Sequence, residues 1–397
     1  MSVSARNLLP CLVLAGGLLS AGCSSDEGST GASRAAVVAN YSANLYRAYS
    51  DSVDDAQAFQ ADITAFLADP TDATLGAARD SWLASREHYM RTEGARFYDG
   101  PIDGTKENYE ALLNSWPLDE AFIDYASKDG VVNEDVGIVN MPELLPEITA
   151  EGLAKLNGSD DEPENVSVGY HAVEFLLWGQ ALKDVGPGER QATDYALDGP
   201  SKNPDRRADY LKVAVAGIIS DLSAVRDAWK PAASYRVEFE KDANQTKTLT
   251  NIFTGLAKFS KGELGSQRIG AAYESKHRHD QHDCFSSETL VDYERDALGI
   301  QAMYLGNYGS NDGPGLDQLV KAADPTLDAD LKKKLQASID AIKDIPTPFE
   351  DAIAGDDDSP GRKKIQAALT ALSEQGDAFG AAAHAIGLTI QVDDPEQ

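Results

Sequence analysis

The chain is poor in cysteine, with three in 397 residues, and this scarcity limits how the fold can be held together. Cys11 lies in an N-terminal apolar segment and Cys23 directly follows that segment, so only Cys284 belongs to the remaining body. A single thiol cannot form a disulfide within that body. We therefore expect the fold to depend on a packed core alone.

Basic residues are also scarce, with 35 Lys and Arg against 65 Asp and Glu, a formal net charge of −30. A surface this acidic repels nucleic acid and anionic lipid, so no nucleic-acid partner is expected. Beyond the first 22 residues no segment is long and apolar enough to cross a bilayer.

The N-terminus predicts export. Residues 1–22 have the short apolar run of a signal peptide. They lead into Leu19-Ser20-Ala21-Gly22-Cys23, which resembles the bacterial lipobox, in which the cysteine is lipidated. An ordinary signal cut near Ala21 is the alternative. Residues 23–33 are small and polar, as in a flexible tether. We therefore predict a lipid on Cys23 and a location in the cell envelope, facing the periplasm or the cell surface.

Apolar periodicity predicts an all-α fold. From Val37 to Phe66, apolar residues recur at steps of three and four, which places them along one side of a long helix. A second helix should follow Pro70, capped by Thr71 or Asp72. Further helices are expected over 205–229, 237–260, 262–280, 286–304, 328–343 and 361–386. Two halves of similar helix content, 34–200 and 201–397, predict two helical-bundle domains, which favours a duplication.

The first candidate site is the pair His171 and Glu174. On a helix, positions three apart share one face. An imidazole and a carboxylate there can form half of a zinc or iron site, or a base with its orienting partner. The apolar neighbours Val173 to Trp178 predict burial, and a buried carboxylate needs a partner. A purely structural hydrogen bond or ion pair is the alternative.

The second candidate is the segment 274–286, which is rich in potential ligands. It holds three of the six histidines and the last cysteine: His277, His279, His282 and Cys284. Glu274 and His277 also have the Glu-x-x-His spacing of di-iron bundles. Two interleaved basic residues argue against one compact metal cage, and a solvated polar helix end is the alternative. No His-Glu-x-x-His is present, so a zincin-type protease is not supported.

Several segments carry a family resemblance. Gly169-Tyr170-His171-Ala172-Val173-Glu174 matches the Gly-x-His-x-x-Glu signature of imelysin-like proteins. Four more segments, in the expected order, resemble the iron-regulated protein A branch of that family: Thr92 to Tyr98, Asn114 to Glu120, Gly262 to Arg268, and His282 to Ser286.

This resemblance implies two modified four-helix bundles with a site near their interface. The implied metal ligands are His171, Glu174, Glu93 and His282, with Arg268 and Cys284 as further ligands or structural support. The metal implied is iron, alone or in a small iron-bearing ligand, with zinc as the alternative. Membrane components of iron uptake are the implied partners.

Three functions follow from these observations. The leading prediction is a lipoprotein that binds iron for uptake, since carboxylates with imidazoles suit iron. The alternatives are a zinc-dependent peptidase, which the family's peptidase label implies, and a metal-free binding protein in which His171 and Glu174 brace the core. The sequence does not name catalytic residues.

Overall fold

The computed structural model describes residues 32–104 and 106–392, and these are mostly helical. The helices are α1 Arg34–Ala68, α2 Asp72–Met90, α3 Tyr109–Leu113, α4 Glu120–Ile123, α5 Gly137–Asn140, α6 Ala150–Leu156, α7 Gly169–Trp178, α8 Pro204–Ala228, α9 Ser234–Phe239, α10 Gln245–Lys258, α11 Ala271–Ser275, α12 Thr289–Leu305, α13 Leu316–Ala323, α14 Pro325–Lys343, α15 Phe349–Ala354 and α16 Pro360–Ala385. A π-helix, Phe259–Gly270, joins α10 to α11. The prediction of an all-α class is confirmed in its helical character.

The two N-terminal helices form where the sequence pattern places them. The predicted apolar stripe of α1 is buried from Val37 to Phe66. The chain turns after Asp69, and Thr71 caps α2 by accepting a hydrogen bond from the Thr74 backbone N–H. A cap of this kind satisfies a backbone donor that the first helical turn leaves free.

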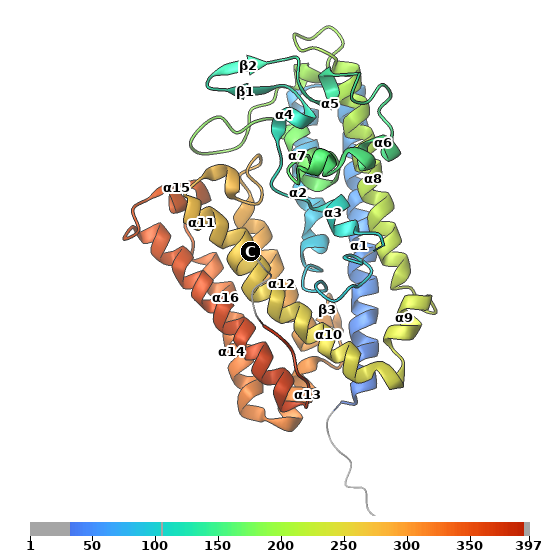
Figure 1. Cartoon of the computed structure of the whole chain (residues 1–397), viewed down its shortest axis with the longest axis vertical. Helices are drawn as coiled ribbons and strands as arrows, with labels where there is room; N and C mark the ends of the chain where they lie inside the picture. The colour runs from blue at the N-terminus through green and yellow to red at the C-terminus, as the bar shows by residue number, and fades with distance from the viewer. Residues whose placement is uncertain (1–31, 105, 393–397) are drawn as a thin grey trace, which may run out of the picture. The chain divides into compact units, whose positions relative to one another are not determined.

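Helix packing brings together segments that are far apart in the sequence. In Figure 1, α1 lies along α2 and α8, while α14 and α16 pack against each other on the other side of the view. Helix α2 contacts both α7 and α12. Because α7 carries His171 and α12 follows the histidine-rich segment, α2 links the two candidate sites.

The division into bundles at 34–200 and 201–397 stays a prediction. Helix α8 begins just after that division and packs against α1 and α7, which precede it. Residues 1–31 and 393–397 lie outside the described part of the chain. The predicted signal peptide, the lipobox with Cys23 and most of the tether are therefore also outside it.

Short strands and turns interrupt the helices. In the described residues, two antiparallel hairpins occur: β1 Ala126–Lys128 with β2 Val131–Asn133, and β3 Asn307–Tyr308 with β4 Asn311–Asp312. The helix expected over 262–280 ends early, because α11 stops at Ser275 and Lys276 adopts a left-handed conformation with φ of 60°. Glu274 and His277 therefore do not share a helical turn. Within the described ranges, no helix combines the length and apolar character needed to cross a bilayer.

Candidate metal centre

Helix α7, which carries His171, begins at a backbone conformation that requires glycine. Gly169 has a φ of +85°, and a Cβ there would lie 2.5 Å from the carbonyl oxygen of Leu113. An L-residue would be strained at this φ and would collide with the end of α3. The glycine of the Gly-x-His-x-x-Glu signature therefore lets α7 begin against α3, two residues before His171.

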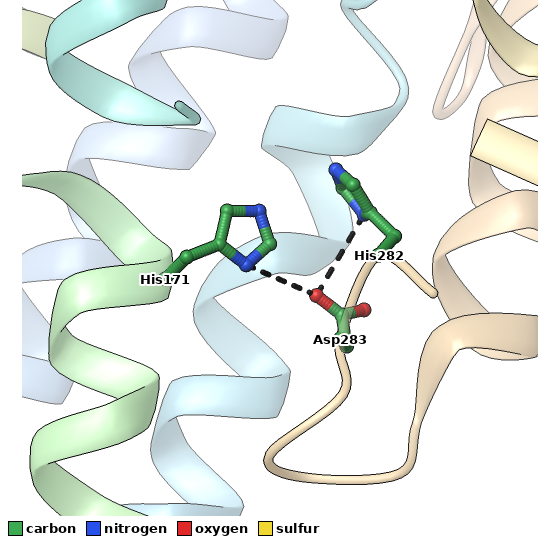
Figure 2. Close-up of side chains that lie close together, drawn as sticks. All are labelled: His171, His282 and Asp283. Atoms are coloured by element: carbon green, nitrogen blue, oxygen red, sulfur yellow. Dashed lines mark ion pairs between the residues drawn. The ribbon is translucent and has the colours of Figure 1, made fainter. Parts of the chain in front are cut away.

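Three buried side chains converge next to α7: His171, His282 and Asp283 (Figure 2). Each is at most 2% exposed, and each offers a ligand atom within 4.8 Å of the other two. The Nδ1 atoms of His171 and His282 lie 3.6 and 3.7 Å from Asp283 Oδ1. This group could hold a metal ion.

Several atoms of this group have no hydrogen-bond partner. They are Nε2 of His171, Nδ1 of His282 and both carboxylate oxygens of Asp283. Leaving a buried polar atom unpaired costs about 1–3 kcal/mol. Four such atoms in one place therefore require an explanation. A cation bound among them would supply the missing partner.

Glu174 connects His171 to the loop that carries His282 and Asp283. Its Oε1 accepts hydrogen bonds from the backbone N–H groups of Phe285 (3.1 Å) and Ser286 (2.7 Å). Its Oε2 lies 3.1 Å from Nδ1 of His171. One carboxylate thus joins α7 to the loop that carries His282 and Asp283. A carboxylate on one imidazole nitrogen orients the ring and leaves the other nitrogen for a metal.

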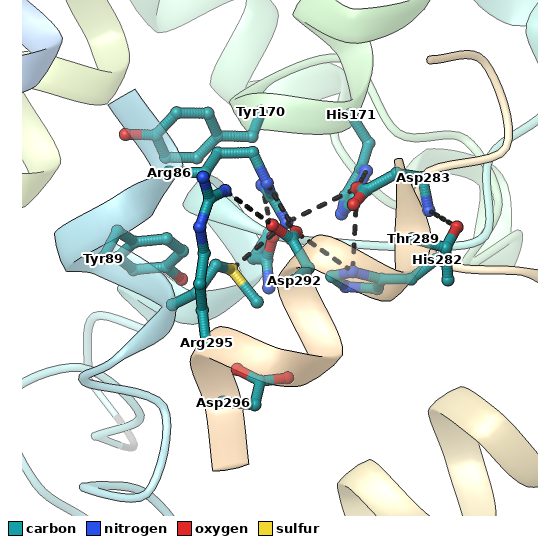
Figure 3. Close-up of polar contacts among 12 residues, drawn as sticks. Arg86, Tyr89, Tyr170, His171, His282, Asp283, Thr289, Asp292, Arg295 and Asp296 are labelled. Atoms are coloured by element: carbon teal, nitrogen blue, oxygen red, sulfur yellow. Dashed lines mark hydrogen bonds and ion pairs between the residues drawn. The ribbon is translucent and has the colours of Figure 1, made fainter. Parts of the chain in front are cut away.

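A buried ion pair supports the group from the side of α2 (Figure 3). Arg86 donates through Nε to Asp292 Oδ2 at 2.7 Å and pairs with the same oxygen through Nη2. Its Nη2 also lies 3.5 Å from Asp283 Oδ1. The guanidinium packs over the rings of Trp82 and Tyr170, 5.0 and 5.1 Å from their centroids.

Burial sets the protonation of the group. It lowers the pKa of His282 to about 4 and the pKa of His171 well below its usual value, so both imidazoles are neutral at neutral pH. The neutral imidazole is the form that binds metal. Burial also raises the pKa of Asp283 well above its usual range, with Asp292 adding to the effect, and raises the pKa of Glu174 to about 8. A bound cation would favour the ionised carboxylates.

Glu93 and Arg268, predicted to contribute to the site, meet each other. Arg268 pairs with Glu93 Oε2 and, through Nη1, with Asp296 Oδ2 at 3.0 Å. Glu93 Oε2 also lies 3.0 Å from Nη1 of Arg96, while its Oε1 has no hydrogen-bond partner. This ion-pair network joins the end of α2 to the π-helix and α12. Glu93 is not among the three grouped ligands, and its role as a metal ligand stays a prediction.

Residues 276–280, 284 and 285 of the histidine-rich segment line a cleft of about 870 Å³. His277 and His279 are exposed there, with ring centroids 5.8 Å apart, while Cys284 is buried in the cleft wall. Burial raises the pKa of the Cys284 thiol, which disfavours the thiolate that binds metal. Only His282 of the three histidines turns inward, toward His171.

Sequence reasoning missed Asp283, Arg86 and Asp292. Asp283 stands between two residues that were singled out, His282 and Cys284, and its position beside a predicted ligand was the available signal. Arg86 follows Trp82 by four positions, on a side of α2 that is largely apolar. A lone arginine there indicates a buried partner, but the spacing does not say which acid supplies it.

Comparison with known proteins identifies relatives in sequence and in fold. A relative, "Iron-regulated protein A" of Synechococcus elongatus, is 24% identical over 310 residues, covering 78% of this chain and 74% of that protein. A crystal structure described as an iron-regulated protein A precursor from Parabacteroides distasonis aligns with a TM-score of 0.68 at 21% identity, over 89% of this chain and 95% of that one. An imelysin-like protein from Psychrobacter arcticum aligns with a TM-score of 0.59 at 13% identity, over 89% and 97%.

The fold and the buried group define a mostly helical protein with two histidines and a carboxylate arranged as for a metal. Residues 45–379 match the sequence profile of imelysin, peptidase family M75. The chain belongs to the imelysin family and is a distant relative of iron-regulated protein A.

Proposed function

We propose that this imelysin-family protein binds iron, alone or in a small iron-bearing ligand, at His171, His282 and Asp283 as a step in iron acquisition. The observation that carries the proposal is the set of unpartnered ligand atoms on these three buried side chains. Two imidazoles and one carboxylate with open positions are the ligand set of non-haem ferrous sites.

The setting proposed for this activity is the cell envelope. Lipidation of Cys23 would tether the protein to a membrane, facing the periplasm or the cell surface, and residues 23–33 would separate it from the lipid. Iron-uptake components in that membrane would then deliver or receive the iron. The name of the Synechococcus elongatus relative, an iron-regulated protein, supports a link to iron.

A zinc-dependent peptidase is the second candidate, because two histidines and a carboxylate also form catalytic zinc sites. The position of the cleft favours binding over proteolysis. Trp116, Cys284 and Phe285 line the cleft, but none of His171, His282 and Asp283 does. A polypeptide lying in the cleft would not reach a metal held by these three. Failure to cleave a denatured protein substrate with zinc supplied would exclude this candidate.

Titration of the metal-free protein with iron tests the proposal. We expect calorimetry with ferrous iron under anaerobic conditions to give one bound ion per chain, because the described residues contain one buried group of this kind. Absence of saturable binding of iron, both alone and with a small chelator, would overturn the proposal.

A further inference from the structure

Two hydrogen-bond donors beside the candidate metal centre have no acceptor. Asn114 is 6% exposed, and its Nδ2 has no hydrogen-bond partner. The indole Nε1 of Trp116, two residues later, is also buried and unpartnered. Both come from the segment after α3, which carries part of the family resemblance and supplies none of the proposed iron ligands.

The contacts of these two residues place them at the centre. Arg86, whose Nη2 lies 3.5 Å from Asp283 Oδ1, donates through Nη1 to Asn114 Oδ1 at 3.2 Å. This bond fixes which amide atom of Asn114 is the oxygen, so the free atom is an N–H donor. The ring of Trp116 meets the ring of His282 edge-on, with centroids 5.8 Å apart.

The chemistry of these groups excludes them as metal ligands. Amide and indole N–H groups donate hydrogen bonds and have no lone pair to offer a cation. They suit an anionic oxygen, and a hydrogen bond to a charged acceptor is about twice as strong as a neutral one. The N–H donors of Asn114 and Trp116, which suit an anion, therefore lie next to the unpartnered ligand atoms, which suit a cation.

The coordination of the metal favours the same pairing. His171, His282 and Asp283 supply three protein donors, which leave coordination positions open on an iron ion. An anionic oxygen can fill such a position.

We propose that iron binds together with a small oxyanion, whose oxygens fill open positions on the metal and accept hydrogen bonds from Asn114 and Trp116. This inference rests on the proposed function. The ligand class is a carbonate or phosphate ion, or the carboxylate of a small organic chelator. Trp116 also lines the 870 Å³ cleft, so its indole lies between that cleft and His282. The cleft would admit a small anion or chelator to this point.

The experiment measures whether anion and iron bind cooperatively. Metal-free wild type is titrated with ferrous iron, anaerobically, in buffer freed of bicarbonate and then with bicarbonate, phosphate or citrate added. Apparent affinities are corrected for complex formation in solution. We expect at least one of these anions to raise iron affinity by about tenfold or more. The three arms distinguish an inorganic anion from an organic carboxylate.

Trp116→Phe is the central variant, because it keeps a ring against His282 and removes only the N–H. Its iron affinity without added anion serves as its own baseline, and against that baseline it should lose most of the anion-dependent gain. Asn114→Asp, which keeps an acceptor for Arg86 and repels an anion, should lose the gain as well. Trp229→Phe is the control, since Trp229 packs among Tyr41, Tyr235 and Phe239.

The outcomes separate this inference from the proposed function. Iron binding that is unchanged by every anion would overturn the oxyanion site and leave the iron site standing. A full anion-dependent gain in both Trp116→Phe and Asn114→Asp would also overturn it. No iron binding in any buffer would reject the proposed function together with this inference.

Discussion

Replacing His171 by alanine is expected to abolish stoichiometric iron binding. The imidazole is one of three grouped protein donors, and Glu174 orients it. A water molecule in its place would be a weaker ligand without that orientation. Removal should weaken binding by about a hundredfold or more, which is about 2.7 kcal/mol of binding free energy. Calorimetric titration of the variant with ferrous iron measures the change.

The control for this loss is the double variant His277→Ala/His279→Ala. These histidines are exposed on the cleft and lie outside the buried group, so the variant should keep both stoichiometry and affinity. If the double variant lost iron and His171→Ala kept it, iron would bind at the exposed histidines. A lower melting temperature of His171→Ala with unchanged iron binding would instead assign the histidine to the core.

Replacing Arg86 by methionine is expected to destabilise the fold severely. The guanidinium is fully buried, and its loss would leave the Asp292 carboxylate inside the protein without its main counter-charge. Burial alone would raise the pKa of Asp292, but the Arg86 guanidinium holds that pKa well below its usual range. Removing one member of a buried pair typically costs about 3–5 kcal/mol of the free energy of unfolding. Urea unfolding of metal-free protein gives this value.

Two further variants check the cause. Arg91→Met removes a partly exposed arginine at the end of the same helix, which pairs with Glu87, and it should cost at most about 1 kcal/mol. Adding Asp292→Asn to Arg86→Met should recover part of the loss, because the Asp292 carboxylate is then no longer left buried as an unpaired charge. An equal loss in Arg86→Met and Arg91→Met, with no recovery in the double variant, would refute the account of the pair.

Local patterns in the sequence predicted the helices and one part of the site. The apolar stripe of α1 and the Thr71 cap of α2 depend on residues close in sequence, and the structure agrees with both. The shared helix face of His171 and Glu174 is local in the same way. Spacing could not show what each residue faces. Glu174 was predicted as a ligand, and that role stays a prediction; its oxygens contact His171 and the backbone of the 285–286 turn.

The rest of the site depends on contacts between distant segments. His282 and Asp283 lie beside His171 because α2 contacts both α7 and α12. The periodicity of the sequence does not predict these contacts between distant segments. The prediction of a helix over 262–280 was wrong at its C-terminal end for a local reason. Lys276 is left-handed and ends the helix, so His277 and His279 turn toward solvent. The unpartnered atoms of Asn114, Trp116 and Asp283 are likewise properties of the packed fold.

The metal content of the protein tests the account most directly. The protein should be isolated from its own host without chelators and analysed for all transition metals by mass spectrometry. We predict close to one iron per chain, and less than about a tenth of that in an Asp283→Ala variant prepared in the same way, since one donor of the buried group is missing. Zinc in place of iron, no bound metal, or equal iron in the variant would contradict the assignment of iron to His171, His282 and Asp283.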